Sequence, residues 1–123
     1  MKYILTEEQY KNLLETNKKL NVFQELIDTK LNELKKECDE NEDSFSGCYE
    51  VDSIEEIKVV DIIHTTKNNS PLIILRIIIF FNTFQYKDYD ETEHELNWWL
   101  RKSTGLPIRI EYKTENLNKE MNW

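Results

Sequence analysis

The sequence contains no alanine, and it has only two glycines and two prolines among its 123 residues. Two isolated glycines cannot form the glycine-rich loop that cradles a phosphate, so nucleotide-binding loops of that type are excluded. Ile, Asn and Lys are abundant and Lys far outnumbers Arg, which is the residue usage of an AT-rich genome. We therefore attribute the missing alanine to codon usage and not to function.

Positive charge is scarce relative to negative charge. The chain carries 24 Asp and Glu against 16 Lys and Arg, for a formal net charge of -8. A free-standing nucleic-acid binder needs cationic side chains to displace counterions from phosphate, and anionic membranes also attract cationic surfaces. We therefore expect a protein partner or self-association and no nucleic acid or membrane. No small-molecule substrate is identified from the sequence. The acidity would also suit a regulator that binds a basic host protein.

No apolar run is long enough to span a bilayer, because the longest, 72–81, is short and is interrupted by Arg76. No signal peptide is recognisable at the start, where Met1 is soon followed by Thr6-Glu7-Glu8. We expect a cytoplasmic or virion location and no secretion. Without export, the two cysteines, Cys38 and Cys48, are expected as reduced thiols, although a disulfide across the short intervening loop is the alternative.

The first 36 residues predict one long helix. Thr6 to Gln9 form a capping box, and leucine or isoleucine then recurs every seven residues from Leu13 to Leu34. About thirty helical residues would span ~45 Å, well beyond the ~13–14 Å radius of gyration of such a domain. Either the helix bends near residues 17–19 or its free end packs on a partner. Val22 and Leu26 fall on a second face, which makes them candidate partner contacts.

An acidic, turn-rich loop is expected over 37–48, followed by a β-hairpin. Its strands are predicted over 54–65 and 71–84, with turn chemistry at Lys67 to Ser70. The second strand is apolar almost throughout, whereas a strand with one solvated face should alternate. Both faces of the hairpin therefore need cover, and Ile77 and Ile79 are predicted to contact a second layer or another chain.

A second helix is predicted over 91–103, capped by Asp90 and ended by Gly105. His94 and Trp98 lie on its polar face and are candidate partner contacts, as is Trp123 in the polar tail, 113–123. A last strand, 106–112, alternates cleanly. The whole chain, 1–123, is thus predicted to be a single α+β domain of order α-β-β-α-β, with its β-β-α-β core in 49–112.

Catalytic and metal-binding motifs are weak. His64 and His94 are the only histidines, and neither lies beside a nucleophile elbow. The spacing of these histidines and the two cysteines fits no zinc pattern, and the acidic loop lacks the EF-hand ligand pattern. We predict no metal, no cofactor and no enzymatic activity.

One enzymatic alternative remains open, a metal-dependent nuclease of the PD-(D/E)xK type. Glu111 and Lys113 form a Glu-x-Lys on the last strand, and Asp61 is the candidate partner carboxylate. Against it, Glu-x-Lys also occurs at Glu56 to Lys58, the Asp is distant in sequence, and the chain lacks a basic substrate surface.

The opening fourteen residues, MKYILTEEQYKNLL, resemble the start of small, uncharacterised proteins of tailed bacteriophages, which often begin Met-Lys-x-Ile-Leu-Thr-Glu-x-x-Tyr. The resemblance covers about a tenth of the chain and carries over no functional residue. It implies a phage virion or accessory component. Together with the candidate contact residues, it predicts a non-enzymatic interaction or assembly protein.

Overall fold

The computed structural model describes residues 19–41, 47–83 and 88–118. Its elements are α2 (Lys19–Glu40), α3 (Cys48–Ser53), β1 (Ile54–Lys67), β2 (Ser70–Phe81), α4 (Asp90–Thr104) and β3 (Ile108–Asn116). The predicted α+β fold and the order α-β-β-α-β are confirmed, with α3 as an additional short helix. The predicted capping box at Thr6 and the bend near residue 17 lie outside the described residues.

The three strands form one mixed sheet in the order β1-β2-β3. β1 and β2 pair antiparallel, and their two-residue turn, Asn68-Asn69, has positive φ values of 53° and 65°. Asparagine tolerates this left-handed conformation, which is the one that tight hairpins require. β3 returns parallel to β2 after the α4 crossover. The hairpin is therefore confirmed, and the last strand adds to its β2 side.

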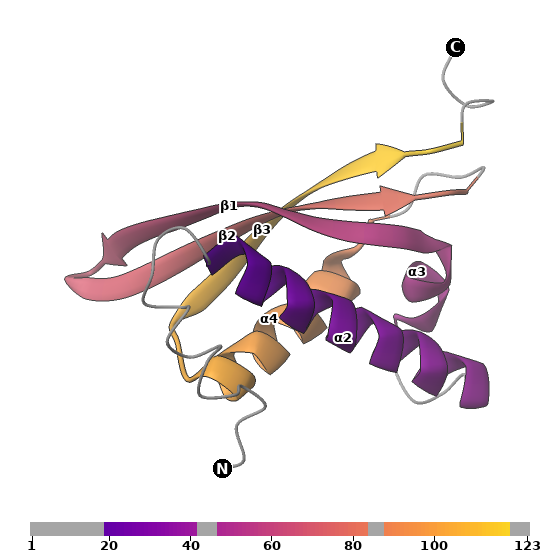
Figure 1. Cartoon of the computed structure of the whole chain (residues 1–123), viewed down its shortest axis with the longest axis horizontal. Coiled ribbons are helices and arrows are strands. Elements are labelled where there is room, and N and C mark those ends of the chain that lie inside the picture. Colours follow the sequence, from indigo (N-terminus) through magenta and orange to yellow (C-terminus); the bar gives the residue numbers. More distant parts are fainter. Residues whose placement is uncertain (1–18, 42–46, 84–87, 119–123) are drawn as a thin grey trace.

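Both long helices pack on the same side of the sheet, α2 against β1 and α4 against β3 (Figure 1). The core lies between this helix layer and the inner sheet face. Val22 and Leu26 of α2 are 3% and 4% exposed, and Ile77 and Ile79 of β2 are 1% and 0% exposed. The prediction that these four side chains contact a partner is therefore wrong, because they form the core instead.

Several predicted boundaries also need correction. α2 continues to Glu40 instead of ending near Lys36, and 48–53 is helical instead of a loop or strand. β3 extends to Asn116, so the first residues of the predicted polar tail are a strand. Charged residues alternate with half-buried ones there, as expected of a sheet with one uncovered face.

Cys38 at the end of α2 and Cys48 at the start of α3 are joined by a disulfide, with their Cα atoms 5.5 Å apart. The expectation of two reduced thiols is therefore wrong. The bond ties together the two helices that flank residues 42–46.

Gly105 ends α4 in the left-handed conformation, as predicted, and its amide donates to the Arg101 carbonyl. The predicted cap at the other end, Asp90, is wrong. The N-cap residue is Tyr89, whose side chain makes no capping bond, and a carboxylate from another helix takes this role.

Candidate functional site

The sheet face opposite α2 and α4 carries no helix among the described residues, and we call it the open face (Figure 1). The strand register arranges its side chains in four rows that cross the sheet from β1 to β3. In order, these rows are Glu56–Phe80–Glu115, Lys58–Ile78–Lys113, Asp61–Arg76–Glu111 and Ile63–Ile74–Arg109.

The centre of the open face is mostly apolar. Ile74, Ile78 and Phe80 of β2 are half-buried by their neighbours, and only Arg76 interrupts them. A depression of about 410 Å³ lies around Arg76 and Ile78, with walls that include Val60 and Tyr112. Val60 is 42% exposed because β1 has an irregularity here that inserts one extra residue. An apolar strip rimmed by charges is the composition of a protein-binding surface.

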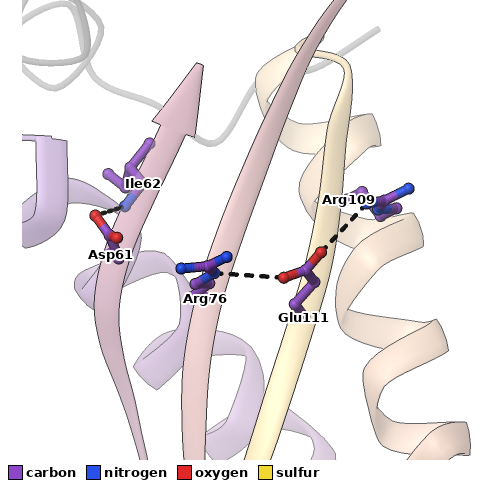
Figure 2. Close-up of polar contacts among 5 residues, drawn as sticks. All are labelled: Asp61, Ile62, Arg76, Arg109 and Glu111. Carbon is purple, nitrogen blue, oxygen red and sulfur yellow. Dashed lines mark hydrogen bonds and ion pairs between the residues drawn. The ribbon is translucent and has the colours of Figure 1, made fainter. Parts of the chain in front are cut away.

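Arg76 lies between the two outer strands and is paired with one of them (Figure 2). Its Nε lies 3.4 Å from Glu111 Oε1, and Arg109 Nη2 lies 3.2 Å from Glu111 Oε2. On the other side, Asp61 Oδ1 accepts a hydrogen bond from the Ile62 amide at 2.9 Å. These groups are largely exposed, so the ion pairs are screened and contribute little stability.

The three residues of the nuclease alternative, Asp61, Glu111 and Lys113, do line one depression. However, the two carboxylates lie on the outer strands, whose backbones are ~10 Å apart, with β2 between them. The Arg76 guanidinium stands in the space between them, where a bridging cation would have to bind. Within 19–41, 47–83 and 88–118, no three His, Cys, Asp or Glu side chains are grouped to hold a metal.

The first part of the outer edge of β1, from Ile54 to Val59, is blocked by helix side chains. The Gln24 amide donates to the Ile57 carbonyl at 2.7 Å and accepts from the Val59 amide at 2.8 Å. Lys35 Nζ donates to the Ile54 carbonyl at 2.6 Å. These bonds occupy backbone groups that an added strand would need, so they protect this edge against β-augmentation.

The outer edge of β3 is blocked in the same way over its first half. Arg101 Nε donates to the Ile108 carbonyl at 2.6 Å, and Asn97 Oδ1 accepts from the Ile110 amide at 2.9 Å. Both side chains come from α4. Side chains of α2 and α4 thus cover the first part of each edge, whereas no described helix covers any part of the open face.

The remaining predicted contact residues differ in their surroundings. Trp98 is 52% exposed and His94 is exposed, as their position on α4 predicted. Lys102 Nζ lies 5.5 Å from the Trp98 ring centroid, which gives that ring an intramolecular partner. Trp123 lies outside the described residues.

Sequence reasoning missed a buried carboxylate at the start of α4. Glu50 of α3 is 0% exposed, and its Oε1 accepts from the Thr92 amide at 3.0 Å and from the Thr92 hydroxyl at 2.9 Å. It therefore caps the N-terminus of α4 from another element. Its Oε2 is buried without a hydrogen-bond partner in the described part of the chain. The sequence gives no signal for this role, because Glu50 is a charged residue near the start of a short helix and its partner Thr92 is distant in sequence.

Burial raises the pKa of Glu50 above its ordinary value, the two bonds from Thr92 oppose this rise, and the negative charges of Glu91 and Asp88 add to it. Nearby, the Tyr112 hydroxyl donates to Asp90 at 2.6 Å and accepts from the Tyr89 amide at 3.2 Å. Burial, followed by that bond to Asp90, raises the pKa of Tyr112 to about 12. Among the described residues, neither group adjoins a nucleophile or metal site, so both are read as structural.

Comparison with family models, curated proteins and solved structures finds no match for this chain. None of the helices that the structure describes combines the length and apolarity that crossing a bilayer requires.

Proposed function

We propose that this protein is a non-enzymatic interaction or assembly protein that binds a protein partner through the open face. The observation that supports this most is the half-buried strip of Ile74, Ile78 and Phe80 on a sheet face that no described helix covers. A sheet that is covered by helices on one side buries that face within the domain. Burial of the second face against another chain would also be favourable, because this face is apolar and the contact would exclude water from it.

The charges on the open face favour this proposal over the alternative of an acidic regulator that binds a basic host protein. Four acidic and four basic side chains occupy its four rows, so the face is formally neutral although the chain carries -8. Binding there depends on apolar contact and on matched charge pairs, and net acidity contributes little. The resemblance of residues 1–14 to phage proteins supports a virion or accessory component as the biological setting.

The test compares partner recovery by tagged wild-type protein and by the double variant Ile74→Thr/Ile78→Thr, expressed in the phage-infected host. Threonine keeps the β-branched shape that suits a strand but removes apolar surface. Leu20→Thr, at an α2 position that is 43% exposed, is the matched control. We expect at least a tenfold loss of recovered partner for the open-face variant and none for Leu20→Thr. Equal recovery by both variants, with unchanged urea midpoints, would contradict the proposal.

A further inference from the structure

The charges of the open face follow a pattern across the sheet that is not visible along the sequence. The first row places an acid at each side of Phe80, namely Glu56 and Glu115. The second places a lysine at each side of Ile78, and the third places an acid at each side of Arg76. The rim charges therefore alternate in sign from row to row along both outer strands.

Such alternation restricts how two copies could stack face to face. A two-fold axis parallel to the strands would superpose each row on itself and set like charges against each other. A two-fold axis that crosses the strands reverses the order of the rows. When it passes between the second and third rows, the second row of one copy faces the third row of the other, and the first faces the fourth.

We propose that a second copy of this chain covers the open face, related by a two-fold axis that runs across the strands between the Lys58–Ile78–Lys113 and Asp61–Arg76–Glu111 rows. This inference rests on the proposed function, because it names the partner of the same face. At the rim, Lys58 faces Asp61, Lys113 faces Glu111 and Glu115 faces Arg109, while Glu56 faces the uncharged Ile63. At the centre, Phe80 faces Ile74. Ile78 faces the aliphatic stem of Arg76, which packs as an apolar group.

The alternative route to self-association, strand addition at a sheet edge, is disfavoured over the first part of β1 and of β3. Gln24 and Lys35 occupy backbone groups on β1, and Arg101 and Asn97 occupy backbone groups on β3. Each would have to be displaced before another strand could pair there. The open face requires no such rearrangement.

The size of the face determines the strength of the interaction. Three strands ~4.8 Å apart and four rows ~7 Å apart give an area of roughly 400 Å² per copy. Twice that area is below the ~1,200 Å² at which stable complexes begin, so the dimer is a weak and reversible one. A rotation of about 30° between stacked sheets shifts the rim contacts beside the axis, such as Lys58 with Asp61, by less than half a row.

The experiment is a charge exchange at one contact, Lys58 with Asp61, read by sedimentation velocity of the purified chain. Lys58→Glu alone sets the new carboxylate against Asp61 twice in each dimer, and Asp61→Lys alone sets two ammonium groups together twice. We expect the wild type to dimerise reversibly at concentrations between about 10 μM and 1 mM, and each variant to have a dissociation constant raised at least tenfold. A 1:1 mixture of the two variants restores both contacts and should associate as the wild type does.

Lys58 and Asp61 are exposed, so neither substitution disturbs the core, and recovery in the mixture shows that both variants are folded. A wild type that is monomeric at about 1 mM overturns the inference, and so does a mixture that associates no better than each variant alone. If the wild type is monomeric but the Ile74→Thr/Ile78→Thr variant recovers less of a different protein than the wild type does, self-association is wrong and the proposed function stands. If neither self-association nor partner recovery depends on the open face, both fail.

Discussion

The carboxylate of Glu50 accepts two hydrogen bonds from Thr92, one from its backbone amide at 3.0 Å and one from its hydroxyl at 2.9 Å. The two residues are 42 positions apart and both are fully buried. This contact fixes α3 to the start of α4 and replaces the side-chain cap that Tyr89 does not provide.

Thr92→Val removes the hydroxyl donor and preserves the side-chain shape, so Glu50 loses one of its two bonds in a buried site. We expect the free energy of unfolding to fall by about 1–3 kcal/mol. Thr29→Val is the control, because the Thr29 hydroxyl bonds to the Glu25 carbonyl on an exposed helix surface. Urea denaturation followed by circular dichroism should show less than about 0.5 kcal/mol for that variant. An equal loss of unfolding free energy in the two variants would show that the Thr92 hydroxyl contributes no more through Glu50 than an exposed helix hydroxyl does.

The same carboxylate predicts a pH dependence of stability. Its folded pKa is raised above the unfolded value of 4.5, so folding favours the protonated form. That contribution is fully present below the unfolded pKa and is lost as pH rises through the folded pKa. Glu50→Gln, which is neutral at every pH, lacks this loss. Urea titrations at a series of pH values should show the wild type weakening relative to Glu50→Gln as pH rises above about 4.5. A constant difference between them would contradict the raised pKa.

The disulfide predicts sensitivity to reductant. Cys38 and Cys48 are 10 positions apart, and closing a loop of this length restricts the unfolded chain by about 2–3 kcal/mol. We expect the urea midpoint to fall on addition of reductant. The double variant Cys38→Ser/Cys48→Ser should match the reduced wild type and should not respond to reductant. Alkylation followed by mass spectrometry gives the oxidised fraction directly, and a wild type unaffected by complete reduction would contradict the prediction.

How far the sequence could predict this structure depended on how local each signal was. Gly105 and the Asn68-Asn69 turn were found correctly, because their backbone conformations restrict the residue type at those positions. The alternation of Ile108, Arg109 and Ile110 correctly indicated a strand with one covered face. The apolar run in β2, broken only by Arg76, predicts cover on both faces, which the structure supports only in part. Ile77 and Ile79 took the inner face, which the run alone could not distinguish from the outer one.

The errors came from contacts between residues that are distant in sequence. The seven-residue repeat marks one face of the helix and leaves Val22 and Leu26 on another, whereas α2 buries both against the rest of its own domain. The role of Glu50 depends on α3 meeting α4. The four-row charge pattern depends on the parallel pairing of β2 with β3, which no local signal specifies.

The protection of the β1 edge can be tested through Gln24. Its amide pairs with both Ile57 and Val59, so Gln24→Ala leaves two partly buried backbone groups without their partners. We expect a loss of about 1–2 kcal/mol and increased aggregation on concentration, because an uncovered edge can pair with other strands. Asn32→Ala, at an exposed position on the same helix, is the control. Light scattering measures aggregation, and urea denaturation measures the free energy of unfolding. If Gln24→Ala changes neither quantity, Gln24 does not protect this edge.

The central claim is that the open face, and not the outer surface of α4, contacts the partner. Its most direct test is photo-cross-linking, in cells that contain the natural partners of this chain, with a photoreactive amino acid placed at position 78 or at position 98. Ile78 lies in the centre of the open face, whereas Trp98 is the most exposed large apolar side chain of α4. The account predicts a defined cross-linked protein, either a second copy or another chain, from position 78 and none from position 98. A product from position 98 with none from position 78 would contradict it.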